Sequence, residues 1–177
     1  MSAIPRWFDR QFEFTFPVEQ FPSLATRLRG TPARLEEMMQ GCTPEILVRK
    51  PHGQEGGKWS AQEHAGHLLD LEPLWMKRVD DFTAGGSELT AADLSNRKTD
   101  EANHNARPVE GILADFRTAR LELVNRISDI EPASISRSML HPRLKKPMRL
   151  VDHLFFAAEH DDHHLAWIWA LIHRKTR

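Results

Sequence analysis

The sequence predicts an all-α protein, a four-helix bundle with one long crossover connection. Four amphipathic stretches have the helical period, Gly- and Pro-containing segments separate them, and no run has the pattern of a strand. The polar connection 87–107 lacks periodicity, and a bundle with one connection this long has a crossover that spans the molecule. A chain of 177 residues fits one domain, 1–177, with residues 1–18 as an N-terminal appendage.

The first two predicted helices cover residues 21–40 and 60–82. Pro32 lies in the middle of the first, which predicts either a kink or two short helices in line. The second has the clearest start signal in the chain, because Ser60 and Glu63 have the spacing of a capping box. It is expected to bend at Pro73 and to stop at the glycines that follow residue 84.

The third and last predicted helices cover residues 108–129 and 149–173. In the third, apolar residues form a stripe that predicts the buried face, and Arg117, Arg120 and Glu122 are expected to face solvent. Residues 87–107 and 141–147 are interpreted as loops, with at most a short turn in the first of these, the crossover.

Composition excludes several classes of function. The net charge is −1, from 24 basic and 25 acidic residues that are well mixed, so no concentrated basic face indicates nucleic-acid binding. No apolar segment approaches the length of a membrane span, and residues 1–16 have no signal-peptide pattern. Cys42 is the single cysteine, which suits a reducing compartment. We therefore predict a cytoplasmic protein with no nucleic-acid or membrane partner.

The last predicted helix contains the strongest chemical signal, the segment Glu-His-Asp-Asp-His-His at 159–164. His160 and His164 are four residues apart, so they point the same way, one helical turn apart. Their face is otherwise apolar apart from His153. Two imidazoles in an apolar stripe need partners, and one metal ion satisfies both. A surface coincidence or a satisfied core pair is the commoner explanation for such a pair taken alone.

A third ligand is expected from another helix. His67 lies at the centre of the apolar face of the second predicted helix, and His64 lies on its flank, so His67 is the better candidate. Three neutral imidazoles leave at least one coordination position open, as in catalytic sites. An ion held in this way lowers the pKa of bound water or binds a thiolate.

Two acidic residues are candidates for catalysis with weaker support. Glu63 is expected to serve the capping box, with contact to a metal-bound water or to a ligand's second nitrogen as the alternative. Asp161 is interpreted as solvated or interhelical, with a supporting role at the metal as the alternative. Asp70 is expected to orient a ligand or to pair with Arg78. Trp59 is expected to pack beneath the start of the second helix, with stacking on substrate as the alternative.

The remaining histidines are secondary. His163 is a competitor of His164, and His153 is expected to line the cavity. The pattern assigns no role to the histidines in loops or at the chain end: His52, His104, His141 and His173.

The last helix is apolar on a second side, which includes Phe155 and Trp169. A helix that is apolar on two sides lies centrally in its own bundle or supplies an interface. We predict a homodimer that uses these two residues. Packing against residues 7–16 is the competing explanation.

Two segments of this chain resemble the DinB/YfiT-like family. Residues 58–70, KWSAQEHAGHLLD, match its W-S-x-x-E…H-L-x-D motif, and residues 158–165, AEHDDHHL, match its E-H-x-x-H-H motif. The resemblance implies a bundle of up-down-down-up topology, often dimeric, with a metal triad on His67, His160 and His164. Relatives bind zinc or nickel, and some transfer low-molecular-weight thiols or isomerise substrates with a thiol cofactor.

The sequence therefore predicts a metal-dependent enzyme of thiol-transferase or hydrolase type that acts on a small molecule. Zn²⁺ or Ni²⁺ is the expected ion, Fe²⁺ or Mn²⁺ also suits imidazole ligands, and a low-molecular-weight thiol is a candidate cofactor. The alternative is a stress or scaffold protein without turnover, in which the metal ties two helices together.

Overall fold

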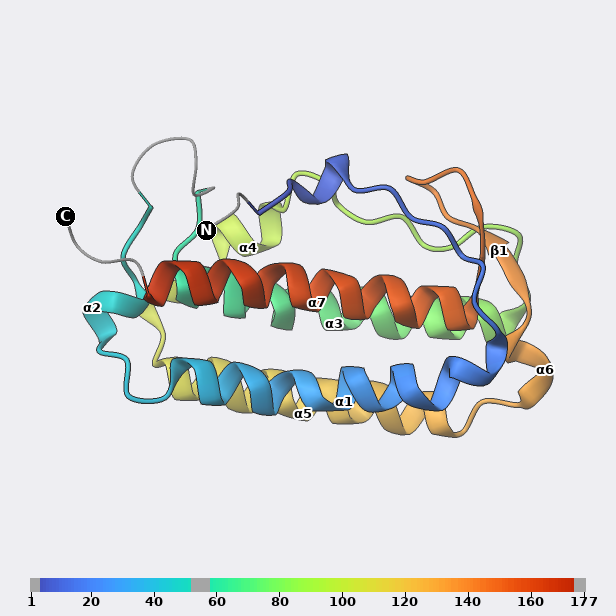
Figure 1. Ribbon diagram of the computed structural model, residues 1–177, viewed down its shortest axis with the longest axis horizontal. Coiled ribbons are helices and arrows are strands. Elements are labelled where there is room, and N and C mark those ends of the chain that lie inside the picture. Colours follow the sequence, from blue (N-terminus) through green and yellow to red (C-terminus); the bar gives the residue numbers. More distant parts are fainter. Residues whose placement is uncertain (1–3, 52–57, 174–177) are drawn as a thin grey trace.

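Four long helices form a bundle in this computed structural model, which describes residues 4–51 and 58–173. They are α1 (Phe21–Met39), α3 (Ala61–Ala84), α5 (Val109–Ser128) and α7 (Leu150–Ile172). Helices α3 and α7 lie side by side in one layer, and α1 and α5 form the other (Figure 1). Helices α1 and α7 run one way and α3 and α5 the opposite way, so the topology is up-down-down-up and the predicted fold class is confirmed.

The start of α3 is fixed by the predicted capping box. The Ser60 hydroxyl accepts a hydrogen bond from the Glu63 amide at 3.1 Å, and the Glu63 carboxylate accepts one from the Ser60 amide at 2.8 Å. The helix continues through Pro73 and ends at Gly85, whose φ of +79° is the left-handed conformation that glycine adopts readily. These caps fix the register that carries His67 on the second turn.

Helix α1 passes through Pro32 without a break, so the interpretation as two short helices is wrong. Proline removes one helical hydrogen bond, and the packing of α1 against α5 and α7 compensates for this loss. Thr31 and Pro32 are both buried in that packing.

The connections contain more structure than predicted. Short helices interrupt them, namely α2 (Pro44–Leu47), α4 (Arg97–Glu101), η4 (His104–Ala106) and α6 (Pro132–Ile135). The expectation of no strands is wrong, because β1 (Ser138–Leu140) pairs antiparallel with β2 (Pro147–Arg149). Strands of three residues are too short to show a period of two in the sequence. Met139 and Met148 face each other in this pair, and both are buried.

The N-terminal segment lies along α7 and includes the short helices η1 (Trp7–Asp9) and η2 (Val18–Gln20) (Figure 1). The Phe16 and Phe155 ring centroids are 5.1 Å apart, so packing against this segment, the competing explanation, accounts for Phe155. Trp169 is 44% exposed, and the homodimer stays a prediction that now depends on this residue. No helix within the described ranges is long and apolar enough to cross a membrane.

Arg120 was expected to face solvent, and this is wrong: its side chain is fully buried. It forms ion pairs with Glu72 of α3, at 2.6 Å, and with Asp161 of α7. Thr31 of α1 donates a further hydrogen bond to Asp161 at 2.8 Å. The charged group therefore joins all four helices. The stripe on α5 predicted only which side is apolar, whereas burial of the flanking arginine depends on carboxylates from distant segments.

Candidate metal centre

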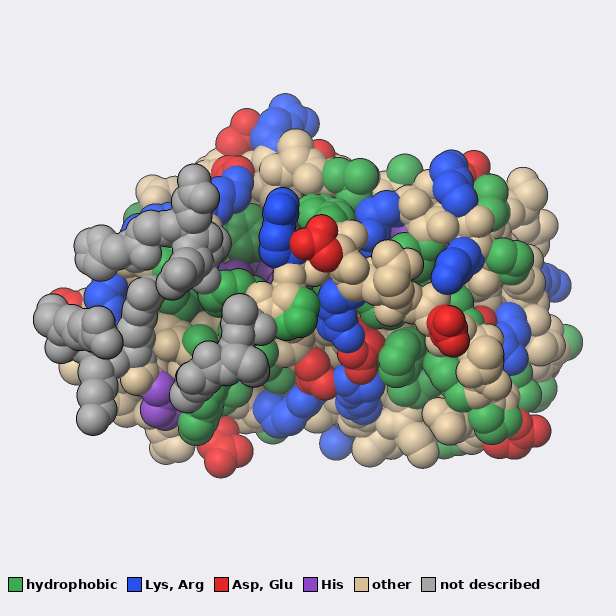
Figure 2. Space-filling view, turned by 45° about the horizontal axis from the view of Figure 1, so that its top comes forward, with side chains coloured by type: hydrophobic (Ala, Val, Ile, Leu, Met, Phe, Trp, Pro, Cys, Tyr) green, Lys and Arg blue, Asp and Glu red, His purple; other side chains and the backbone are tan. Residues whose placement is uncertain are grey.

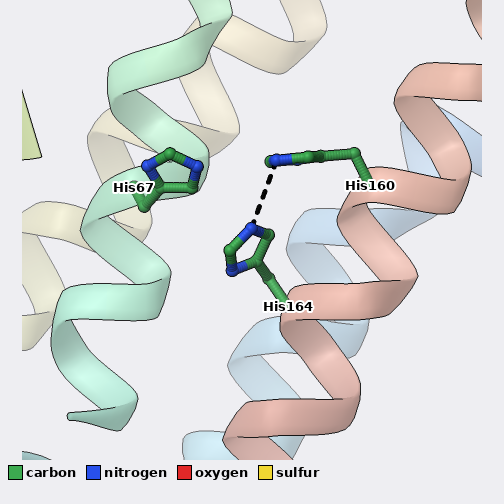
Figure 3. A group of neighbouring side chains, drawn as sticks. All are labelled: His67, His160 and His164. Carbon is green, nitrogen blue, oxygen red and sulfur yellow. Dashed lines mark hydrogen bonds between the residues drawn. The ribbon is translucent and has the colours of Figure 1, made fainter. Parts of the chain in front are cut away.

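Three histidines meet between helices α3 and α7: His67 of α3, and His160 and His164 of α7 (Figure 3). One ring nitrogen of each lies within 4.8 Å of the others, and all three residues are at most 5% exposed. Zinc–imidazole bonds are about 2.0–2.1 Å long, so nitrogens grouped in this way can face a single ion. The structure brings together the three residues that the sequence predicts.

The pair on α7 has the geometry expected for residues one turn apart. The Nε2 atoms of His160 and His164 are 3.2 Å apart, and their ring centroids are 4.4 Å apart (Figure 3). The predicted competitor, His163, has its ring 5.2 Å from that of His164 and lines the cavity described below.

Burial keeps these rings neutral. It lowers the pKa of His67 from 6.5 to about 4 and holds the pKa values of His160 and His164 well below 6.5, with further lowering from neighbouring histidines. A neutral imidazole has one nitrogen lone pair free to bind a metal, whereas an imidazolium has none. The protonation state therefore suits a metal site at neutral pH.

Hydrogen bonds fix the tautomer of His67. Thr99 donates its hydroxyl proton to Asp70 at 2.9 Å, so its oxygen accepts from Nδ1 of His67 at 3.0 Å. Although burial opposes it, hydrogen bonds from His104 and Thr99 lower the pKa of Asp70, which keeps the carboxylate ionised. With Nδ1 protonated, Nε2 of His67 carries the free lone pair. Asp70 thus orients His67 through Thr99, and its predicted pairing with Arg78 is wrong.

His64 supports His164 of the triad. Its Nδ1 lies 2.8 Å from Nδ1 of His164, so one of the two rings donates to the other. Burial lowers the pKa of His64 to about 3. Nδ1 of His160 and Nε2 of His64 are shielded from solvent and have no hydrogen-bond partner among the described residues. Buried polar atoms without partners are rare in folded proteins, and they are expected where a ligand completes the site.

His104, which the pattern left without a role, supports this site from the crossover. It is 1% exposed, and its Nε2 donates to Asp70 at 2.9 Å. Its ring lies on Gly66, where an added Cβ would come within 2.2 Å of the imidazole. A glycine inside a helix is a sequence signal for such a close approach, although it does not indicate which residue approaches.

A cavity of about 760 Å³ adjoins the three histidines, between α3, α7, the N-terminal segment and the crossover. Figure 2 shows histidine side chains inside a recess on this face, between Lys and Arg side chains. Trp7 and Trp59 line it, with ring centroids 4.9 Å from His160 and 4.6 Å from His67. Trp59 therefore packs at the start of α3, as predicted, and also faces the cavity.

Other predicted positions lie away from the cavity. His153 is buried beside Trp75 and Phe82 and is not among the described residues that line the cavity, so that expectation is wrong. The carboxylate of Glu63 caps α3 and pairs with Lys50. Asp161 is interhelical, one of the two predicted interpretations, through its pairing with Arg120. His52 lies outside the described residues.

Comparison with known proteins identifies the family. A sequence model of the DinB superfamily matches residues 27–168. The chain belongs to the DinB superfamily. The solved structure of YfiT from Bacillus subtilis matches with a TM-score of 0.76 at 20% identity, over 92% of this chain and 91% of that chain. YfiT is described as "a probable metal-dependent hydrolase with an unusual four-helix bundle topology". At this identity the likeness shows the fold alone. No curated protein matches the chain.

Proposed function

We propose that this protein is a metal-dependent hydrolase that acts on a small molecule, with a divalent ion held by His67, His160 and His164. The observation that carries the proposal is the grouping of three buried, neutral imidazoles at the wall of a cavity of about 760 Å³. The likeness to YfiT, which is described as "a probable metal-dependent hydrolase", supports the proposed reaction class.

A divalent ion in such a site supplies a Lewis acid that polarises a substrate bond and activates water. The chain supplies orientation: Asp70 and Thr99 hold Nδ1 of His67, and His64 holds Nδ1 of His164. Indole rings of Trp7 and Trp59 shield the histidines from bulk water. A low-dielectric wall of this kind strengthens electrostatic interactions with a bound substrate.

Zinc or nickel is the proposed ion, with iron or manganese as alternatives, since imidazole ligands suit all four. Transfer of a low-molecular-weight thiol to an electrophilic substrate is the proposed alternative reaction, because the same open position accepts a thiolate. A non-catalytic protein with a structural metal is the second alternative. It is supported by the position of the histidines between α3 and α7, because a bound ion would tie these helices together.

Elemental analysis of untagged protein tests the metal. Wild type is expected to contain close to one equivalent of a divalent ion, whereas His67→Ala and His164→Ala are expected to contain little. His173→Ala is the matched control, because His173 is exposed at the end of α7 and is expected to leave the content unchanged. Wild-type protein without metal, even after reconstitution with zinc or nickel, would overturn the proposal.

Activity assays then separate the reaction classes. Zinc-loaded wild type is screened against ester and amide libraries, and separately against electrophiles with an added thiol. Turnover that His67→Ala abolishes while the variant keeps its melting temperature supports catalysis. A metal whose loss mainly lowers the melting temperature, without turnover in either screen, supports the structural alternative.

A further inference from the structure

Arg78 lines the same cavity as the histidines and forms no ion pair with the carboxylates that the structure describes. It is 2% exposed, and its Nε donates to the carbonyl oxygen of Thr90 at 2.9 Å. No carboxylate in the described ranges is within ion-pair distance of its guanidinium. Burial lowers its pKa to about 10, so the group is still charged at neutral pH. The Asp81 carboxylate acts on this charge without forming an ion pair. A buried charge without a direct ion pair is costly, and a bound anion lowers that cost.

His141 presents a second unused donor at this point. Its Nδ1 accepts hydrogen bonds from the backbone amides of Arg143 and Leu144, at 3.2 and 3.1 Å. Burial and the charges of Arg78 and Arg143 lower its pKa to about 3, so the ring is neutral and its proton is on Nε2. Nε2 lies 3.3 Å from Nη1 of Arg78. Both atoms are donors, so they do not satisfy each other, and an acceptor is missing.

Arg143 supplies a third donor group. Its guanidinium lies over the rings of Phe8 and Phe156, 5.4 and 5.7 Å from their centroids. Its Nη2 is shielded from solvent and has no hydrogen-bond partner among the described residues. The side chain lines the cavity, and no carboxylate that the structure describes pairs with it. Three groups with unused donors thus line one region, and no described residue supplies an acceptor for Nη2 of Arg143 or Nε2 of His141.

The cavity connects this region with the histidine triad. The Trp75 ring centroid is 5.6 Å from the guanidinium carbon of Arg78 and 5.6 Å from the His160 ring centroid. Asp93 is the single acidic residue among the described residues that line the cavity. Its carboxylate already accepts hydrogen bonds from Ser95. The wall is therefore cationic near Arg78 and aromatic between Arg78 and the triad.

We propose that Arg78, Arg143 and His141 form an anion subsite that binds a carboxylate of the substrate. Guanidinium groups bind carboxylates through paired, charge-assisted hydrogen bonds, and Nε2 of His141 adds a third donor. The substrate is then a small carboxylate with an aromatic or apolar body beside Trp75 and its reactive bond at the triad. The role in substrate selection rests on the proposed function, whereas anion binding itself does not require the metal.

Calorimetric titration with phenylacetate, and with phenylacetamide as its neutral analogue, tests the subsite in chelator-treated and in zinc-loaded protein. Wild type is expected to bind phenylacetate roughly 10- to 100-fold more tightly than the amide, because a hydrogen bond to a charged group is stronger than one to a neutral group. Arg78→Gln and Arg143→Gln are each expected to remove most of this preference. Their melting curves establish that the variants are folded, and either variant alone suffices for the test.

Lys58→Gln is the matched control, because Lys58 lines the same cavity but is paired with Asp100. It is expected to retain the preference for the carboxylate. An equal loss in all three variants would indicate only the general positive field of the cavity and would overturn the subsite.

Two further outcomes separate this inference from the proposed function. Preference for phenylacetate that persists in chelator-treated protein and in His164→Ala supports the subsite even if no metal is ever found. If the preference for phenylacetate requires zinc and Arg78→Gln does not change it, the carboxylate binds to the ion, and the subsite is overturned. Equal binding of the acid and the amide, or no binding of either, overturns it as well.

Discussion

Two buried polar clusters flank helix α7, and they differ in how completely their groups are paired. In the first, Arg120 is bonded to Glu72, Asp161 and the carbonyl oxygen of Leu28, so its guanidinium lies between two carboxylates. In the second, around the triad, Nδ1 of His160 and Nε2 of His64 have no partner among the described residues. Both clusters are almost free of solvent contact.

This difference separates a cluster that stabilises the fold from one that suits the proposed metal site. A buried charge network that is fully paired is neutral or favourable as it stands, and it becomes costly when one member is removed. A cluster with unpaired donors and acceptors costs stability until something binds there. The Arg120 cluster is therefore structural, and the histidine cluster together with Arg78 supports the proposed site.

The largest expected effect is loss of the metal-free fold in mild acid. Burial lowers the pKa of His64 to about 3 and of His67 to about 4, whereas the unfolded chain binds protons near 6.5. Between these values protons bind preferentially to the unfolded state, so stability is complete above pH 6.5 and falls as the pH drops toward 4. Circular dichroism of chelator-treated protein across this range is expected to show unfolding.

His153→Phe sharpens this prediction, because His153 is a buried histidine outside the triad whose pKa burial holds well below 6.5. The variant is expected to reduce the pH slope of stability by up to about 1.4 kcal/mol per pH unit, the contribution of one proton. The exposed-site variant His173→Gln is expected to leave the slope unchanged. An acid response that neither substitution alters would place its origin outside His153 and His173.

Arg120→Met is expected to destabilise the protein by about 3–5 kcal/mol, because it leaves Glu72 and Asp161 buried without their counter-ion. Arg117→Met is the control, since the ion pair between Arg117 and Glu36 is part-exposed and contributes about 0–1 kcal/mol. Urea denaturation measures both values. Similar losses in the two variants would contradict the structural role of the buried cluster.

Zinc is expected to stabilise the wild type by about 2.7 kcal/mol when free zinc is 100 times its dissociation constant. The same addition is expected to leave His160→Ala unchanged, because two imidazoles bind the ion much more weakly than three. Thermal melts with and without zinc, compared at matched concentrations, give the difference. Stabilisation that survives in the variant would show that the ion binds elsewhere.

The smallest expected effect is that of Thr99→Val, which removes the hydroxyl between Asp70 and His67. Loss of a group that orients a ligand costs roughly 10- to 100-fold in metal affinity, so competition with a fluorescent chelator is the appropriate measurement. Thr118→Val is the control, because the Thr118 hydroxyl bonds only to the Ala114 carbonyl on the exposed side of α5. Equal affinities in the two variants would show that Thr99 does not orient His67.

Much of the fold follows from local pattern. The capping box at Ser60 and the glycine stop at Gly85 fixed the predicted limits of α3 closely, because caps are short-range hydrogen bonds between neighbours in sequence. The paired strands were missed because three residues show no period. Pro32 was misjudged because packing on α5 and α7 outweighs the loss of one hydrogen bond in α1.

The positions of the triad could also be predicted, for a similar reason. A spacing of four residues places His160 and His164 on one face, and the apolar stripe of α3 places His67 at the interface. Thr99, His104 and the donors near Arg78 could not be predicted, because they lie in or contact the crossover and the hairpin, whose paths have no periodic signal.

The sequence by itself therefore determined the helices, their topology through the family motifs, and the three histidines, since each depends on short-range spacing. Only the tertiary structure decided which polar groups are paired. Arg120 forms ion pairs with two carboxylates from other helices, whereas Arg78 forms none with the residues that the structure describes. Whether a buried charge stabilises the fold or binds a ligand depends on partners far away in sequence, and folding alone brings those together.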